Sequence, residues 1–436
     1  MATKTHEIRD PIHVFVRLDS DERRLLDSRP FQRLRHIHQL ATTFLVYPGA
    51  THTRIEHSLG VMELATRIYD VVTTPANLLY DSARAVVPRD DEYKYWRRVL
   101  RAAALCHDIG HLPFSHAAEK ELLPAGYDHE RIGREMIEGP VLRPVWDTLK
   151  VQPQDVAKVA VGPDKYPEPL NTWENILAEI IVGDAFGADR MDYLLRDSHH
   201  AGVAYGRFDH FRLVDTMRIL PTSEDGSAEP SLGITQGGLQ SAEALLWARY
   251  LMFAQLYLHH VRRIYDVHLK EFLQQWLPGG RFHTDVEAHL RLSDSEVMSG
   301  LRDAATDPSK PGHEPARRLL KREHYRLVYE KNPADQERNR QSTRCVYEAV
   351  AGEFGPAAVR LDSYPAKSGS VDFPVYTRNE RIESSLDMSK TLKEIPTFGV
   401  DYVFIDPSLR EKAKDWLKQN RERIIPANGG TGDGVA

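Results

Sequence analysis

The stretch Leu105-Cys106-His107-Asp108-Ile109-Gly110-His111 gives the strongest indication of what this 436-residue chain is. It places a histidine directly beside a carboxylate, and another histidine, His57, lies fifty residues upstream. A distant histidine, a His-Asp pair and a later aspartate can together hold a divalent metal by mixed nitrogen and oxygen ligation. The sequence therefore predicts a metal-dependent hydrolase.

Apolar residues recur at spacings of three and four through much of the first 280 positions, which predicts a mainly helical body. One such stripe, ending at His107, puts the His-Asp pair at the C-terminal end of a buried helix, and Gly110 should stop that helix. A second helix is expected over 173–197, where Gly183 and Gly187 could interrupt it, and a third over 239–277.

The later part of the chain has weaker patterns. Residues 221–238 are rich in Ser, Gly, Glu and Pro and predict a loop or a short hairpin. Beyond a break at 303–315, residues 316–329 form an expected basic helix, and strands are expected near 358–361 and 402–405. The Gly-rich tail 427–436 is expected to be disordered.

Composition narrows the class of protein. The chain is 41% hydrophobic and 28% charged, as is ordinary for a globular protein. It has no signal-peptide pattern and no run of eighteen apolar residues, so we expect a soluble cytoplasmic protein without membrane contact. A net charge of -6 argues against sequence-independent coating of nucleic acid. Cys106 and Cys345 are too few for a disulfide framework or a zinc-thiolate site.

The order His57, His107-Asp108 and Asp189 resembles the HD-domain phosphohydrolase superfamily, in which metal ligands occur as His, His-Asp, Asp. Further stretches are similar to the deoxynucleoside triphosphate triphosphohydrolases within it, a family that includes a vertebrate enzyme with sterile-alpha-motif and HD domains. They are Asp10-Pro11-Ile12-His13, Phe31-Gln32-Arg33-Leu34-Arg35, Tyr47-Pro48-Gly49-Ala50, Gly110-His111-Leu112-Pro113-Phe114-Ser115-His116 and Arg196-Asp197-Ser198-His199-His200. The resemblance covers residues 8–275 well and the C-terminal third loosely.

This resemblance implies that His57, His107, Asp108 and Asp189 are the metal ligands. The metal would be iron, manganese or magnesium, and a second magnesium could accompany the substrate triphosphate. A bound metal lowers the pKa of its water and polarises the phosphoryl group, and both effects suit attack at the α-phosphorus.

The resemblance also implies a catalytic cluster beside the metal, formed by His111, His116, Glu119, His129 and Glu130. In that arrangement His116 is the candidate general acid for the leaving 5′-oxygen, and Glu119 or His129 orients it. An imidazole with a pKa near 6.5 can donate a proton at neutral pH. Some relatives have Asp in place of Glu119, which keeps the charge and changes only the reach.

Three arginines, Arg54, Arg190 and Arg249, match positions that bind the triphosphate. Guanidinium groups provide bidentate hydrogen bonds to phosphate oxygens. The expected role of these residues is therefore to hold and neutralise the polyphosphate.

Sugar and base contacts are implied in the same way. Tyr193 resembles the tyrosine that packs against deoxyribose and disfavours a 2′-hydroxyl, while Gln39 and Asp197 match residues that bond the 3′-hydroxyl. Asp189, Tyr193 and Asp197 should share one helix face, because they are four residues apart. Tyr257 matches the base pocket, but Leu258 follows it where the vertebrate relatives have Gln, so base preference is open.

The expected fold is an all-helical HD domain over residues 1–300, with the metal site within 50–200, and a smaller α+β region over 301–426. The implied function is hydrolysis of deoxynucleoside triphosphates to deoxynucleoside and inorganic triphosphate, in nucleotide-pool control or defence against phage. A homo-oligomer, dimer or tetramer, and a nucleotide activator are further expectations. The alternatives are an HD-fold phosphatase, phosphodiesterase or nuclease, and a nucleotide-sensing regulator; nucleic-acid binding is not favoured.

Overall fold

The computed structural model describes residues 4–117, 119–222, 229–367 and 371–426. Contacts divide the chain into two compact units. The first unit contains residues 1–252, 281–297 and 368–396, and the second contains 253–280, 298–367 and the remainder from 397. The single boundary expected at residue 300 stays a prediction. The expected disordered tail, 427–436, lies outside the described residues.

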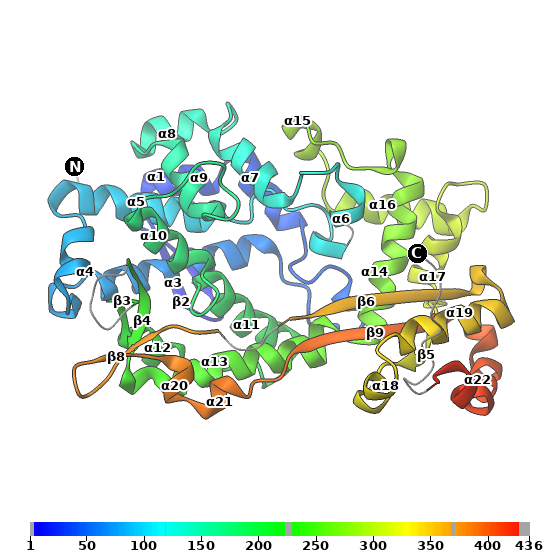
Figure 1. The fold of residues 1–436 in the computed structure, drawn as a ribbon. Helices are drawn as coiled ribbons and strands as arrows, with labels where there is room; N and C mark the ends of the chain where they lie inside the picture. Colours follow the sequence, from blue (N-terminus) through cyan, green and yellow to red (C-terminus); the bar gives the residue numbers. More distant parts are fainter. Residues whose placement is uncertain (1–3, 118, 223–228, 368–370, 427–436) are drawn as a thin grey trace, which may run out of the picture. The chain divides into compact units, whose positions relative to one another are not determined.

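The first unit is mainly helical, which confirms the predicted class (Figure 1). Its helices are α1 (Ser20–Leu26), α2 (Arg29–Arg33), α3 (Arg54–Val72), α4 (Asp81–Val86), α5 (Asp90–Cys106), α6 (Glu119–Leu122), α7 (His129–Glu138), α8 (Arg143–Leu149), α9 (Pro153–Val161), α10 (Thr172–Val182), α11 (Ala188–Ala201), α12 (His210–Thr216), α13 (Leu239–Met252), α15 (Val286–His289), α20 (Ser385–Met388) and α21 (Lys390–Lys393).

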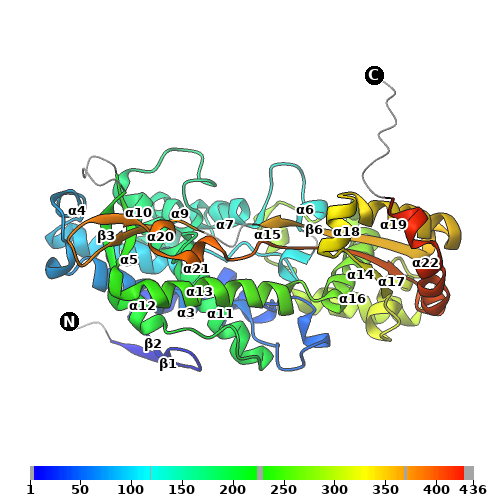
Figure 2. The ribbon, with the colours of Figure 1, turned by 60° about the horizontal axis from the view of Figure 1, so that its bottom comes forward.

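The described part of the first unit also contains two small sheets. The antiparallel hairpin of β1 (His6–Asp10) and β2 (Val14–Leu18) lies close to the N-terminus (Figure 2). A second sheet has the order β3-β4-β7-β8, from β3 (Met217–Pro221), β4 (Pro230–Thr235), β7 (Pro374–Tyr376) and β8 (Ile382–Ser384). A loop or short hairpin was expected over 221–238; the antiparallel pair β3–β4 forms a hairpin that begins earlier, at Met217, and only its second strand lies within that range.

The second unit combines helices with one antiparallel sheet of order β5-β9-β6. Its strands are β5 (Arg326–Glu330), β6 (Val359–Lys367) and β9 (Phe398–Ile405), and its helices are α14 (His260–Trp276), α16 (Asp294–Thr306, whose first turn belongs to the first unit), α17 (His313–Leu320), α18 (Pro333–Arg338), α19 (Ser342–Phe354) and α22 (Arg410–Ile424). Buried apolar side chains of β5, β6, β9, α19 and α22 form its core. The expected strands near 358–361 and 402–405 are therefore confirmed.

Helix α3 is the centre of the first unit, because it packs against both α5 and α11 (Figure 1). Most of its residues are buried around its whole circumference, as befits a helix covered on several sides. Helix α5 ends at Cys106, and His107 is its C-cap. The predicted position of the His-Asp pair is therefore confirmed.

Two expected helices are interrupted. The helix over 173–197 is divided into α10 and α11, and a Cβ built on Gly187 would lie 2.7 Å from the carbonyl oxygen of Gly183, so only a glycine fits this turn. The helix over 239–277 is divided by a π-helical turn, Phe253–Tyr257, after which the Nδ1 atom of His259 accepts the backbone N–H of Val261 and starts α14.

The basic helix expected over 316–329 is wrong in its second half. Helix α17 ends at Leu320, and Arg322 has a left-handed backbone with φ of 58°. The chain then enters β5, which pairs with β9. Tyr325, Val328 and Tyr329 favour a strand there, although the positive charges suggested a continuous helix.

Candidate metal centre and active site

Three elements bring a cluster of potential metal ligands together. His57 comes from α3, His107 from the C-cap of α5, and Asp189 from the first turn of α11. One ligand atom of each lies within 4.8 Å of the others. The Nε2 atom of His57 is 2.9 Å from Asp189 Oδ1, and that of His107 is 3.6 Å from the same oxygen. Asp189 lies where the cluster is open to solvent, because 34% of its side chain is exposed.

Both histidines are oriented by a hydrogen bond at the far side of the ring. The Nδ1 atom of His107 donates to the carbonyl oxygen of Ala104 at 2.8 Å, and Nδ1 of His57 lies 2.8 Å from Asp192 Oδ2. Such bonds leave Nε2 as the ligand atom of a neutral imidazole. The buried Nε2 of His107 has no hydrogen-bond partner among the described residues.

The electrostatics of this cluster favour a positive charge. Burial lowers the pKa of His57, but the carboxylates of Asp189, Asp192 and Asp108 outweigh this effect and raise it to about 10. Burial raises the pKa of Asp189, but His107 and His57 lower it by more. The pKa of Asp189 therefore lies below its ordinary value. Two imidazoles with carboxylate oxygens are a donor set that fits a divalent metal.

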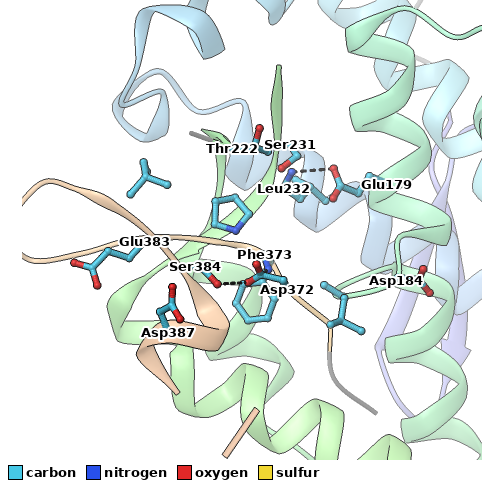
Figure 3. Close-up of a pocket in the computed structure, with 14 residues that line it drawn as sticks. Glu179, Asp184, Thr222, Ser231, Leu232, Asp372, Phe373, Glu383, Ser384 and Asp387 are labelled. Carbon is cyan, nitrogen blue, oxygen red and sulfur yellow. Dashed lines mark hydrogen bonds between the residues drawn. The ribbon is translucent and has the colours of Figure 1, made fainter. Parts of the chain in front are cut away.

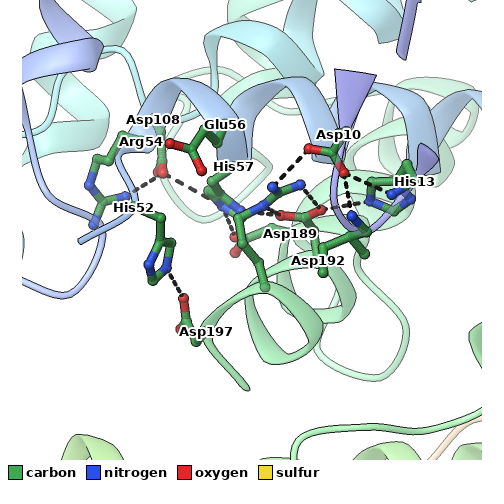
Figure 4. A network of polar contacts seen from close by, with 12 residues as sticks. Asp10, His13, His52, Arg54, Glu56, His57, Asp108, Asp189, Asp192 and Asp197 are labelled. Atoms are coloured by element: carbon green, nitrogen blue, oxygen red, sulfur yellow. Dashed lines mark hydrogen bonds and ion pairs between the residues drawn. The ribbon is translucent and has the colours of Figure 1, made fainter. Parts of the chain in front are cut away.

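Asp108, the fourth predicted ligand, faces two neighbours. One carboxylate oxygen makes an ion pair with Arg54, and the other lies 3.1 Å from His111 Nε2. The same carboxylate is 3.6 Å from His57 Nε2 (Figure 4). It is also 3.5 Å from His107 Nε2. Asp108 therefore lies between the metal-ligand cluster and the next group of histidines.

The predicted catalytic residues His111, Glu119, His129 and Glu130 form that next group. The rings of His111 and His129 stack with centroids 3.9 Å apart. Glu119 Oε1 accepts both the backbone N–H of His129 at 2.6 Å and its Nδ1–H at 2.7 Å. The structure therefore fixes His129 at the first position of α7 through Glu119.

These histidines differ in their charge state. Burial and the nearby positive charges of Arg54 and His129 hold the pKa of His111 well below its ordinary value. Burial also lowers the pKa of His129, but the carboxylates of Glu119 and Glu130 outweigh it and raise that pKa. At neutral pH His111 is therefore neutral, whereas His129 holds its proton more firmly.

Gly110 allows α7 to approach the metal centre. A Cβ built on Gly110 would lie 2.1 Å from the carbonyl oxygen of His129 and 2.4 Å from the backbone nitrogen of Gly133. The glycine was expected to stop a helix, but α5 already ends at Cys106, so the role of Gly110 is to permit the backbone contact that brings His129 beside His111.

The turn at residues 114–116, which follows Gly110, carries His116, the predicted general acid. Phe114 and Ser115 both have left-handed backbones, with φ of 55° and 56°. Ser115 Oγ donates to the carbonyl oxygen of His38 and accepts from Arg54 Nε, and Phe114 N–H donates to buried Asp294. The side chain of His116 lies outside the described residues, so its role stays a prediction.

Two of the predicted phosphate-binding arginines lie near Tyr193. Burial raises the pKa of the Tyr193 hydroxyl, and the charges of Arg190 and Arg249 oppose that shift. Arg190 also donates from Nη2 to Asp184 at 2.9 Å. Arg54, the third arginine, is buried beside Asp108. Positive charge therefore borders the cluster on more than one side.

Gln39 and Asp197 are connected through His52. The backbone N–H of Gln39 donates to the carbonyl oxygen of His52 at 3.0 Å, and His52 Nε2 lies 2.7 Å from Asp197 Oδ1. The buried Oε1 of Gln39 has no hydrogen-bond partner among the described residues. Tyr257 belongs to the second unit, so its place at a base stays a prediction.

Several residues around the site were not anticipated as site residues. They are His13, His52, Ser115, Asp192, Arg196 and Asp294. His13, Ser115 and Arg196 stand within stretches that resembled the family, and Asp192 is three residues after Asp189. Polar residues inside these stretches were therefore a usable signal.

A cavity of about 480 Å³ lies elsewhere in the first unit (Figure 3). Its lining includes Glu179, Asp372, Glu383 and Asp387, and none of the predicted site residues. A wall so rich in carboxylates repels a polyphosphate. This cavity is therefore a poor candidate for nucleotide binding.

Comparison with known protein families agrees with this geometry. The HD domain family matches residues 54–145, and the HD associated region matches residues 208–395. A solved structure of a hypothetical protein from Aquifex aeolicus superposes with a TM-score of 0.78 at 30% identity, over 95% of this chain and 100% of that one. The chain belongs to the HD-domain family.

Curated relatives fall into two groups. An uncharacterized protein of Methanocaldococcus jannaschii is 38% identical over 68% of this chain and 54% of its own length. Human deoxynucleoside triphosphate triphosphohydrolase SAMHD1 is 27% identical over 74% of this chain and 54% of its own length. The chain thus spans about half the length of these curated relatives. In the part of the chain that the structure describes, no helix is long and apolar enough to cross a membrane.

Proposed function

We propose that this protein hydrolyses deoxynucleoside triphosphates to deoxynucleoside and inorganic triphosphate. The observation that carries the proposal is the pair of adjoining clusters, His57-His107-Asp189 and Asp108-His111-His129, bordered by the Tyr193 face of α11. The human relative named a deoxynucleoside triphosphate triphosphohydrolase supports the choice of substrate.

His57, His107 and Asp189, with Asp108 beside them, would hold the divalent metal. When bound, the metal polarises the phosphoryl group and lowers the pKa of its water. Iron, manganese and magnesium all accept this mixture of imidazole and carboxylate. A second magnesium accompanying the triphosphate belongs to the same proposal.

The remaining residues bind and orient the substrate. Arg54, Arg190 and Arg249 would neutralise the triphosphate, because guanidinium groups pair with phosphate oxygens in a bidentate manner. The carboxylate of Asp197 would accept the hydrogen bond of the 3′-hydroxyl, and the side-chain amide of Gln39 would donate a hydrogen bond to the oxygen of that hydroxyl. These contacts would position the α-phosphorus at the metal cluster.

Proton transfer to the leaving 5′-oxygen is assigned to His116. Glu119 and His129, which are hydrogen-bonded to each other, would orient it and keep positive charge near the leaving group. A general acid of this kind contributes about 10²–10⁴-fold to the rate. Glu130 would support His129, since Nδ1 of His129 lies 3.2 Å from Glu130 Oε2.

Product analysis tests the proposal. Metal-loaded protein is incubated with the four deoxynucleoside triphosphates, singly and mixed, beside ribonucleotides, and the products are separated by anion-exchange chromatography. Deoxynucleoside with intact triphosphate is the expected result, and a signal only in the mixture would reveal a nucleotide activator. Pyrophosphate or free phosphate would instead indicate another HD-type phosphohydrolase.

A pair of histidine variants completes this test. His107→Ala should lose bound metal and turnover, because Nε2 of His107 faces the ligand cluster. His283→Ala is the matched control, since His283 is an exposed histidine of the same unit. Full metal content and turnover in His107→Ala would overturn the assigned site.

A further inference from the structure

The turn of the N-terminal hairpin lies within hydrogen-bond reach of the helix that carries Asp189. Strands β1 and β2 pair from His6–Leu18 to Asp10–Val14, so the turn consists of residues 11–13. Its last residue, His13, is buried, and its Nε2 atom lies 2.7 Å from Asp192 Oδ1 (Figure 4). Neither side chain has any solvent exposure.

Asp192 is shared by three partners. Its Oδ2 atom accepts from His57 Nδ1 at 2.8 Å and from Arg196 Nε at 2.8 Å, while Oδ1 accepts from His13 and from Arg196 Nη2 at 3.0 Å. Every donor is a ring or guanidinium nitrogen, so the carboxylate is fully hydrogen-bonded and held in one orientation.

Asp10 closes the network at the hairpin. Its Oδ2 atom accepts from Arg196 Nη1 at 2.9 Å, and its Oδ1 atom accepts the backbone N–H groups of Ile12 and His13 at 2.9 and 2.7 Å. One carboxylate thus shapes the turn and anchors it to α11. His13 is therefore fixed from the backbone as well as through its ring.

The central helix α3 leaves space for this network at Gly60. A Cβ built on Gly60 would lie 2.0 Å from Asp192 Oδ1 and 2.3 Å from Arg196 Nη2. His57 is three residues earlier on the same helix. The contact between α3 and α11 is therefore close enough to bring the carboxylate against the ring of His57.

We infer that Asp192, held by Arg196 and by His13 of the N-terminal hairpin, is the positioning residue that fixes His57 for metal binding. The inference rests on the proposed metal centre. By accepting the Nδ1–H of His57, Asp192 leaves Nε2 directed at the ligand cluster. Carboxylates that orient a ligating histidine in this way commonly change metal affinity by about 10–100-fold. The hairpin thereby becomes a part of the metal centre without contributing a ligand.

Metal affinity is the readout that tests this role. Mn²⁺ binding to the full chain is measured by competition with a chromophoric chelator, in the wild type and in Asp192→Asn and His13→Gln. The amide of Asp192→Asn cannot accept from all the surrounding donors, so we expect Mn²⁺ to bind roughly 10–100-fold more weakly. His13→Gln removes one contact to Asp192, and the expected loss is smaller, roughly 3–10-fold.

A matched control separates positioning from general loss of stability. Glu22→Gln disrupts a comparably buried ion pair with Arg101, on α1 and α5, without contacting the network. It should lower the thermal stability and leave the Mn²⁺ affinity within twofold of wild type. Affinity within twofold of wild type in both Asp192→Asn and His13→Gln would overturn the inference.

Two outcomes keep the inference distinct from the proposed function. If His107→Ala keeps its metal, the proposed centre itself is wrong. If His107→Ala loses metal but the network variants do not, only the positioning role fails. Should Asp192→Asn not fold, His13→Gln decides alone, because it leaves the contacts between Asp192 and Arg196 intact.

Discussion

The side-chain carboxyl group of Glu179 has a raised pKa in the folded protein. It lines the acidic cavity, where burial outweighs the hydrogen bond from Leu232 N–H and raises its pKa to about 7, from an ordinary 4.5. The fold therefore favours the protonated form. This stabilisation is fully present below pH 4.5 and is lost as the pH rises through 7.

Glu179→Gln removes this titration, since a neutral amide can still accept the N–H of Leu232. We expect the wild type to lose roughly 2 kcal/mol of unfolding free energy between pH 5 and pH 8 that the variant does not lose. Urea denaturation of both proteins at these two pH values measures the effect. If the difference in unfolding free energy between the two proteins were the same at both pH values, the raised pKa of Glu179 would be contradicted.

Tyr193 tests the proposed sugar pocket. It shares the face of α11 with Asp189 and lies near the charges of Arg190 and Arg249. Removing its ring in Tyr193→Ala should reduce the preference for deoxy- over ribonucleotides by roughly tenfold, because the ring no longer opposes a 2′-hydroxyl. The ratio of kcat/KM for the two sugars is the measurement. The same ratio in both proteins would exclude this role.

Residues that act through a neighbour were the hardest to predict. His107 stands out in the sequence because a His-Asp pair at a helix end can bind metal directly. Asp192 and His13 offer no such pattern, since their meaning depends on contacts between α11, α3 and a distant hairpin. Linear spacing places Asp189 and Asp192 on the same helix but does not distinguish a ligand from the residue that orients one.

At the scale of elements, the close contact of α3 and α11 depends on Gly60. Gly60→Ala would place a methyl group 2.0 Å from the carboxylate of Asp192, so α3 or α11 must shift. Overpacking of this kind costs about 1–3 kcal/mol. Thermal and chemical denaturation should show the loss.

Gly352→Ala is the matched control for that substitution. Gly352 lies inside α19, and nothing lies within 4 Å of a Cβ built there. Alanine at a compatible helical position stabilises by about 0.4–1 kcal/mol. Equal effects of the two substitutions would show that Gly60 is not needed for close packing.

The hairpin contains a second test at Val14. Its φ of 69° is left-handed, which costs a β-branched residue about 1–2 kcal/mol, and the residue is 54% exposed. Val14→Gly should therefore raise the unfolding free energy by about 0.5–1 kcal/mol. Val16→Gly should lower it, because Val16 is buried in the neighbouring part of β2. A lower unfolding free energy in Val14→Gly would show that the left-handed backbone at Val14 is not strained.

Element boundaries were predictable where a residue dictates the backbone. Gly183 and Gly187 marked the break between α10 and α11, and the stripe ending at His107 marked the end of α5. The π-turn Phe253–Tyr257 could not be seen, because apolar residues at spacings of three and four continue through it. Positive charges also concealed the start of β5, where Val328 and Tyr329 favour a strand and the strand pairs with β9.

At the scale of the whole molecule, the chain passes between its two units more than once. Residues 281–297 return to the first unit, where Asp294 accepts hydrogen bonds from the backbone of Phe114 and His38. A sequence pattern describes neighbours along the chain, so it cannot reveal such a return. The mainly α class and the small C-terminal sheet were predictable, whereas the interleaving of the units was not.

The division of the chain into two units predicts which helices a bound metal stabilises. A ligand that binds the folded state at a hundred times its Kd stabilises it by about 2.7 kcal/mol. The proposed ligands lie on α3, directly after the C-terminal end of α5, and on α11, all in the first unit, so hydrogen exchange of these helices should slow when Mn²⁺ is added. Helices α19 and α22, packed with the sheet of the second unit, serve as the internal control.

The expected result is a difference between the two groups of peptides in one hydrogen-exchange mass spectrometry experiment. Peptides from α3, α5 and α11 should gain protection in proportion to metal occupancy, since opening them requires release of the ion. Peptides of β1–β2 should gain protection as well, because His13 contacts Asp192 and through it His57. Protection limited to the ligand helices would confine the metal's effect to the ligand cluster, and equal protection of α19 and α22 would show that the two units respond to metal as one.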